Sequence, residues 1–138
     1  MNVRVIVLWA TWLSLAWAAG LTGLAAAGNT WVLDRVAGGF YVESGMPMWL
    51  RVVYALMTVG ILSVAWLVLR YFQNDVTRRQ RNLGRLVILL FTLSATVNAL
   101  SQSEPERFNA IAAAVTVVGV ALLRRRQVSD YIDLRSRR

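Results

Sequence analysis

Residues 48–72 read MWLRVVYALMTVGILSVAWLVLRYF and decide the fold class of this chain. A helix over this stretch, at about 1.5 Å per residue, is long enough to cross the roughly 30 Å hydrocarbon core of a bilayer. Its charges are confined to Arg51 and Arg70 near the two ends, where a long side chain reaches the headgroups while its stem stays in hydrocarbon. The stretch therefore predicts a transmembrane helix.

Two further segments have the same character. Residues 3–27 carry Arg4 as their only charge, and residues 83–101 carry Arg85 near one end. The first segment also resembles a signal peptide that ends in small residues before Gly28. It is longer than a cleaved hydrophobic region, so we expect a retained helix.

The fourth apolar run, residues 108–123, is short for a span. Ser103 and Glu106 have the Ser-x-x-Glu spacing of a capping box, with Pro105 in the first turn, so the helix is expected to begin about a turn earlier. We therefore predict an all-α integral membrane protein, a small bundle of four transmembrane helices over residues 3–27, 48–72, 83–101 and 104–123. These spans form a transmembrane domain of residues 1–126, followed by a basic cytoplasmic tail of residues 127–138.

Composition excludes several function classes. The 138 residues are 57% hydrophobic and 16% charged, which is too apolar for an ordinary water-soluble domain. There is no cysteine and no histidine, and all 15 basic residues are arginine. Thiol–disulfide chemistry, thiolate or imidazole metal sites, Ser–His nucleophile pairs and lysine Schiff bases are therefore excluded. We expect neither a metal nor a cofactor.

The arginines predict the orientation. Twelve of the 15 flank the spans on one side, and only Arg35, Arg51 and Arg107 flank the other. Because cytoplasmic flanks are enriched in Lys and Arg, both termini are expected in the cytoplasm. Arginine in place of lysine, with much alanine, suggests a GC-rich bacterial genome and hence the cell's inner (plasma) membrane.

The first non-cytoplasmic loop, residues 28–47, predicts a short helix at the membrane interface. Asn29 is suited to an N-cap, and Trp31, Leu33 and Val36 follow at helical spacing. We expect this apolar side to face inward.

The third span carries the strongest polar signal inside the membrane. Ser94, Asn98 and Ser101 recur at i, i+4 and i+7 and so share one helical face. Such a face either bonds to a neighbouring helix or lines a path for a small solute. We favour the first interpretation, since polar side chains in spans commonly bond to a neighbouring helix, and leave the second open.

Aromatic and basic side chains predict a layer at the cytoplasmic half of the membrane. In one interpretation they bind an anionic lipid headgroup, and in the other they form an ordinary aromatic belt with arginines that reach the interface. The layer comprises Arg4, Trp9, Trp12, Trp66, Arg70 and Arg85. After the last span, Arg124, Arg125 and Arg126 begin the basic tail, which is expected to bind anionic lipid and not nucleic acid, although the net charge is +8.

Small residues predict surfaces for close helix packing. Ala19, Gly23 and Ala27 form one such row, and Ala16 with Gly20 form another. They suit packing within the bundle, a homo-oligomer, or docking on a larger membrane protein.

These features favour a non-catalytic function. All seven acidic residues are expected in loops, caps or the tail, so no carboxylate is predicted within a span for proton coupling or catalysis. We therefore expect an accessory or scaffold subunit, or a homo-oligomer, acting through helix packing and its basic cytoplasmic face. The alternative is a passive conduit, such as a small channel, a transporter or a holin, lined by the polar face of the third helix. A lipid-modifying enzyme is supported only by the aromatic and arginine layer.

Overall fold

The computed structural model describes residues 2–73 and 76–136, with side chains described as far as residue 125. All regular structure in these residues is helical. The four long helices are long and apolar enough to cross a membrane, which confirms the predicted class of helical bundle. The elements are α1 (Val3–Ala27), η1 (Thr30–Arg35), η2 (Ala37–Gly39), α2 (Met48–Phe72), α3 (Arg78–Ala99) and α4 (Glu104–Ser136).

Helix α3 begins and ends earlier than the apolar pattern predicts, whereas the bounds of α1 and α2 coincide with it. Thr77 and Gln80 form a capping box: the Thr77 side chain accepts from the Gln80 N–H at 3.3 Å, and Gln80 Oε1 accepts from the Thr77 N–H at 2.8 Å. These bonds satisfy N–H groups that have no partner in the first turn of a helix. At the other end α3 stops at Ala99, so Ser101 lies in the turn and the prediction that it belongs to the helix was wrong.

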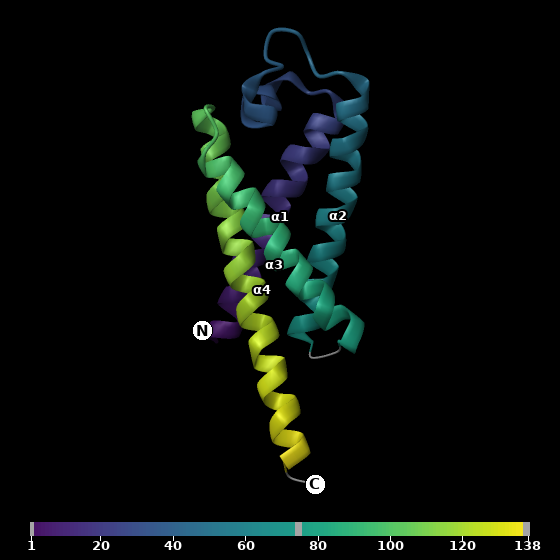
Figure 1. Cartoon of the computed structure of the whole chain (residues 1–138), viewed down its shortest axis with the longest axis vertical. Coiled ribbons are helices and arrows are strands. Elements are labelled where there is room, and N and C mark those ends of the chain that lie inside the picture. Colours follow the sequence, from purple (N-terminus) through teal and green to yellow (C-terminus); the bar gives the residue numbers. More distant parts are fainter. Residues whose placement is uncertain (1, 74–75, 137–138) are drawn as a thin grey trace.

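Helix α4 is longer than its apolar run. It begins at Glu104 as predicted, but its backbone continues past residue 123 as far as Ser136 (Figure 1). Arginine has a high helix propensity, which suits continuation through residues 124–126. The side chain of Arg126 and those of the tail, residues 127–138, lie outside the described residues.

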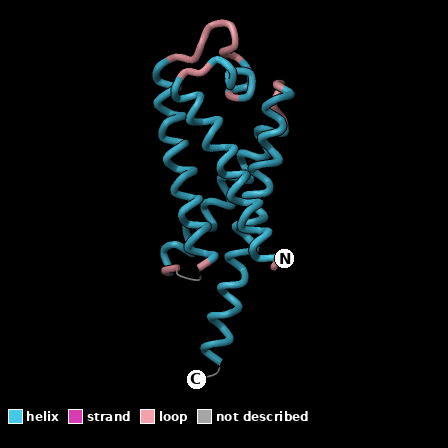
Figure 2. Tube along the Cα trace, turned by 180° about the vertical axis from the view of Figure 1, so that it is seen from behind, coloured by secondary structure: helices cyan, strands magenta, loops and turns pink. Residues whose placement is uncertain are grey.

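The helices run up and down as two antiparallel pairs. α1 packs along α2 and also along α4, and α4 packs along α3. α2 and α3 meet close to their connecting loop and then diverge, so they contact each other little (Figures 1 and 2). The bundle is therefore well packed on one side and open between α2 and α3.

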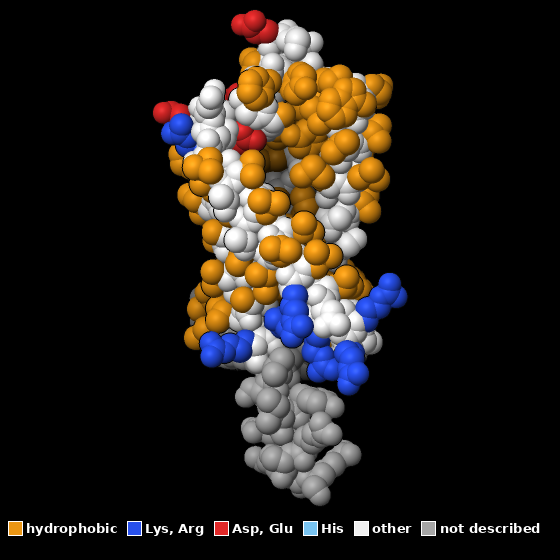
Figure 3. Space-filling view, in the orientation of Figure 1, with side chains coloured by type: hydrophobic (Ala, Val, Ile, Leu, Met, Phe, Trp, Pro, Cys, Tyr) orange, Lys and Arg blue, Asp and Glu red, His pale blue; other side chains and the backbone are white. Residues whose placement is uncertain are grey.

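The two ends of the bundle carry different charges. Arginine side chains gather at the end where α1 begins, which we call the arginine end, and carboxylates lie near the opposite end (Figure 3). We call the opposite end, which holds residues 28–47 and the α3–α4 turn, the hairpin end. The described side chains of the arginine end include Arg4, Arg70, Arg78, Arg79, Arg81, Arg85, Arg124 and Arg125.

Two buried clusters hold the helices together. The one toward the arginine end draws on all four long helices and consists of Leu15, Leu67, Val68, Tyr71, Val87, Val120 and Leu123. The one toward the hairpin end joins α1, α2 and residues 30–36, and consists of Leu21, Ala25, Val32, Val36 and Tyr54. Burial in both clusters fixes α1 within the bundle.

Glycines allow the closest helix approaches. A Cβ at Gly119 of α4 would overlap the side chain of Thr11 on α1, and a Cβ at Gly84 of α3 would overlap the Tyr71 hydroxyl of α2. Nothing lies within 4 Å of a Cβ at Gly20, so that predicted packing position faces open space. Spacing identifies a smooth face but does not say whether another helix covers it.

The loop at the hairpin end is tied down by a short helix. η1 has the predicted cap, because the Asn29 side chain accepts from the Trp31 N–H at 2.9 Å. Val32 and Leu33 are buried, but Trp31 remains 52% exposed. The prediction that Trp31 faces inward was therefore wrong, since the tight 3-10 turn brings Val32 to the interior face instead.

Candidate functional site

A cavity of about 480 Å³ lies inside the bundle, between the two buried clusters. All four long helices and the end of η1 contribute to its wall. Figure 3 shows a hollow in the surface toward the hairpin end. Its lining includes Trp17, Leu21, Thr22, Arg35, Tyr54, Met57, Gly60, Ile61, Val64, Leu90, Phe91, Ser94, Asn98, Glu106, Asn109 and Ala113.

The inner end of the cavity is closed by apolar side chains. Ile61, Val64 and Phe91 line the cavity and also pack against the buried cluster toward the arginine end. Below them, Val68 and Tyr71 are fully buried. The cavity therefore ends within the bundle and does not continue to the arginine end.

The cavity opens sideways between α2 and α3. Met57 of α2 and Leu90 of α3 both line it, yet they are 47% and 53% exposed. Both side chains are apolar, so the rim of this opening is apolar on the α2 side and on the α3 side.

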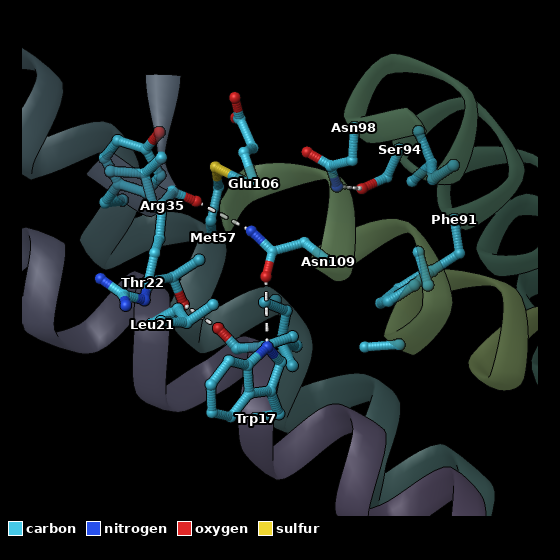
Figure 4. A pocket seen from close by; sticks show the side chains of 18 of the residues that line it. Trp17, Leu21, Thr22, Arg35, Met57, Phe91, Ser94, Asn98, Glu106 and Asn109 are labelled. Carbon is cyan, nitrogen blue, oxygen red and sulfur yellow. Dashed lines mark hydrogen bonds between the residues drawn. The ribbon is translucent and has the colours of Figure 1, made fainter. Parts of the chain in front are cut away.

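Asn109 joins three parts of the chain at the cavity wall. Its Nδ2 donates to the backbone oxygen of Arg35 at 2.8 Å, and its Oδ1 accepts from Trp17 Nε1 at 3.2 Å (Figure 4). The amide thus links α4 to the last residue of η1 and to α1. Because an unpaired amide in an apolar site is costly, these bonds stabilise the arrangement of the wall.

Glu106 places a carboxylate at the hairpin end of the cavity. Glu106 is only 9% exposed. Its Oε2 accepts hydrogen bonds from the Gly38 N–H at 2.9 Å and from the Ser101 hydroxyl at 2.5 Å. Both donors are neutral, and within the described part of the chain Glu106 has no ion-pair partner. The expectation that Glu106 serves only as a helix cap was therefore incomplete.

The predicted capping box is only half formed. Ser103 Oγ accepts from the Glu106 N–H at 3.4 Å, as predicted. The Glu106 carboxylate does not return the bond, because the Ser103 N–H donates to Ser101 Oγ at 3.1 Å instead. The carboxylate instead accepts from the Gly38 N–H and the Ser101 hydroxyl.

The predicted polar face of α3 is split by the structure. Ser94 and Asn98 line the cavity, and Asn98 Nδ2 donates to Ser94 Oγ at 3.3 Å (Figure 4). Among the described residues none donates to Asn98 Oδ1, so this oxygen can accept hydrogen bonds from a ligand. Ser101 does not line the cavity and acts on it only through Glu106.

The predicted aromatic and arginine layer lies elsewhere and forms separate contacts. Arg70 lies over the Trp66 ring at 5.4 Å, and Arg4 lies over the Phe72 ring at 4.8 Å. Trp9, Trp12 and Arg85 are exposed, and none of the six predicted layer residues lines the cavity. Near them, Arg124 Nε donates to the backbone oxygen of Arg81 at 3.2 Å, and Arg125 is exposed.

Sequence reasoning missed three residues of the site, namely Trp17, Glu106 and Asn109. One signal could have found two of them: Glu106, Asn109, Ala113 and Thr116 fall at i, i+3, i+7 and i+10, a single face of α4. The structure places this face toward the interior, where Ala113 and Thr116 are buried.

No protein-family model, curated protein or solved structure matches this chain. The fold and the cavity define the class: a four-helix bundle of membrane-spanning character with a closed-ended cavity in its interior.

Proposed function

We propose that this chain is a non-catalytic, multi-pass protein of a bacterial inner membrane that binds a membrane-soluble ligand in its cavity. The observation that carries the proposal is the cavity itself, which is closed toward the arginine end and open between α2 and α3. Its volume of about 480 Å³ falls within the range of small-molecule sites, which are mostly apolar with a few placed polar groups.

The proposed orientation puts the arginine end in the cytoplasm. The gathering of arginines there supports this assignment, because positive charge marks the cytoplasmic side of membrane proteins (Figure 3). The cavity then lies in the outer half of the bilayer, and η1 lies at the outer interface. Burial of Leu15, Leu21 and Ala25 supports α1 as a permanent part of the bundle.

The closed inner end weighs against a solute path through a single chain. Ser94 and Asn98 line the cavity, but Phe91 and Ile61 separate them from the arginine end. We therefore expect liposomes that contain the protein to show no solute flux above empty liposomes. Flux that falls in the Asn98→Leu variant would instead support a conduit.

Native mass spectrometry of the protein, gently extracted from its own membrane, tests the binding function. Gly60 lines the cavity and a Cβ there has nothing within 4 Å, so Gly60→Phe fills the cavity without a clash. Gly20→Phe is the matched control, since Gly20 also faces open space but lies outside the cavity.

We expect the wild type and Gly20→Phe to retain a bound small molecule that Gly60→Phe lacks. Equal adducts on all three proteins would mean that the bound mass sits on the outer surface, and the function would be rejected. Absence of any adduct on the wild type would reject it as well.

An accessory or homo-oligomeric role is a second proposal, favoured by one surface feature. A shallow groove of about 270 Å³ runs between α1 and α4, lined by Ala10, Ala114 and Gly119 among other apolar residues. Small side chains let helix backbones approach closely in membranes. The same mass spectra test this role, because a heteromeric or multimeric mass supports it and a monomeric mass contradicts it.

A further inference from the structure

We infer that the cavity selects an organic cation with an apolar body, and that Glu106 supplies the counter-charge. This inference rests on the proposed function and names the class of ligand. It follows from the charge of the cavity wall, from its remaining hydrogen-bond acceptors and from its aromatic faces.

Glu106 places a negative charge at the cavity without an ion-pair partner among the described residues. Glu106 is 9% exposed, and the groups that bond to its carboxylate, the Gly38 N–H and the Ser101 hydroxyl, carry no formal charge. An anion in a low-dielectric site gains strongly from a cation placed beside it, because water does not screen the pair. A cationic ligand would provide that charge.

The arginine that lines the cavity does not neutralise Glu106. Arg35 Nη1 pairs with Asp34 Oδ1 at 2.5 Å and also donates to the Trp31 backbone oxygen at 2.9 Å. Its guanidinium lies 4.2 Å from the centroid of the Trp31 ring. Arg35 is thus held by side chains and backbone of η1 itself, and the negative charge of Glu106 has no ion-pair partner within the described residues.

The cavity wall also offers a neutral acceptor and aromatic rings. Asn98 Oδ1 accepts no bond from the described residues, so it is a second acceptor for a ligand that carries positive charge or N–H groups. In Figure 4 Asn98 and Asn109 lie on either side of one space, with the Trp17 ring below, and the Glu106 carboxylate lies at the upper edge of the view. Aromatic faces attract cations, and the apolar walls suit a hydrophobic body.

Tetraphenylphosphonium and tetraphenylborate provide a direct test. Both ions are hydrophobic and have the same shape, but they carry charges of opposite sign. Binding is measured by equilibrium dialysis of the full chain in phosphatidylcholine nanodiscs, with empty nanodiscs subtracted. Glu106→Gln removes the charge and keeps an oxygen that can accept from Gly38 and Ser101. Glu104→Gln is the matched control, since Glu104 lies in the same helical turn but is exposed.

We expect saturable binding of tetraphenylphosphonium to the wild type and to Glu104→Gln, with affinity about tenfold lower in Glu106→Gln. Tetraphenylborate should bind the wild type more weakly than tetraphenylphosphonium does. Gly60→Phe should abolish binding of both ions. Because this variant keeps Glu106, it tests the cavity even where Glu106→Gln does not fold.

The outcomes separate the two proposals. One outcome is that both ions bind the wild type, Gly60→Phe abolishes the binding of both, and Glu106→Gln changes the affinity for neither. The cavity is then a binding site, but the proposed charge selection is wrong. If Glu104→Gln weakens binding as much as Glu106→Gln, a diffuse surface charge is responsible and the inference also fails. If neither ion binds the wild type, the inference is overturned, and native mass spectrometry still decides whether the cavity binds another molecule.

Discussion

The guanidinium of Arg51 donates a hydrogen bond of 3.0 Å from Nε to the carbonyl oxygen of Ala26, and so closes the end of α1 with the first turn of α2. Its Nη2 also donates to the Ala27 oxygen at 2.9 Å. At the other end of the same helix pair Arg4, in the first turn of α1, donates to the Phe72 oxygen in the last turn of α2. Each helix thus supplies a cation to carbonyls that lack partners within the other helix.

Arg51→Met should destabilise the bundle because it leaves these carbonyls without a donor. Hydrogen bonds to charged groups contribute roughly 1.5–3 kcal/mol each. Because the bond to Ala27 is exposed to solvent and contributes less, we expect a loss of about 2 kcal/mol in the free energy of unfolding. Titration of the micellar protein with sodium dodecyl sulfate measures it. Arg85→Met is the control, since Arg85 is exposed and should change stability little; equal losses would show that the cap contributes nothing.

Gly119→Val should weaken the packing of α1 against α4. A side chain at Gly119 meets Thr11, which is fully buried and whose hydroxyl donates to the Val7 oxygen at 2.7 Å. Overpacking of this kind costs about 1–3 kcal/mol. The same titration should show this loss for Gly119→Val and little change for Gly20→Val, because Gly20 has open space around it. A stable Gly119→Val protein would mean that α1 and α4 are packed less closely.

Asn109→Leu keeps the approximate shape of the side chain but removes both of its hydrogen bonds. The Trp17 N–H and the Arg35 carbonyl then lose their partner, at a cost of about 1–3 kcal/mol. We expect lower thermal stability and faster hydrogen exchange around residue 35. Asn82→Leu, on the exposed surface of α3, should change neither quantity. Unchanged exchange in Asn109→Leu would contradict the anchoring role.

The class of fold could be predicted from the sequence because a bilayer imposes a length and an apolar composition on each span. Residues 3–27 and 48–72 show this well, since their apolar runs coincide with α1 and α2. The start of α3 was missed because its first turn is polar and is set by the capping pair Thr77 and Gln80, not by hydrophobicity. The sequence also did not predict which helices pack against each other, because lipid-facing and helix-facing surfaces are both apolar in a membrane protein.

The candidate site was predictable only in part. Ser94 and Asn98 stood out as polar residues in an apolar helix, and both line the cavity. Glu106 did not, since a glutamate in a first helical turn has an ordinary capping role. Its place at the cavity depends on η2, which brings the Gly38 N–H to the carboxylate. Such contacts between distant segments have no pattern in the sequence.

Cysteine labelling should establish the orientation, since the natural chain has no cysteine and each introduced thiol is unique. Ser44 is exposed in the loop at the hairpin end, and Gln73 is exposed at the arginine end. Because positive flanks stay in the cytoplasm, we expect Ser44→Cys to react with a membrane-impermeant maleimide in intact cells or spheroplasts. Gln73→Cys should react only after the membrane is permeabilised.

A reversed pattern, with Gln73→Cys labelled first, would invert the proposed topology and place the cavity in the inner half of the bilayer. Labelling of both thiols before permeabilisation would show that the preparation leaks, which a cytoplasmic marker enzyme reports independently. The expected pattern would leave the opening between Met57 and Leu90 facing the outer leaflet. A ligand could then reach Glu106 from that leaflet without crossing the arginine end.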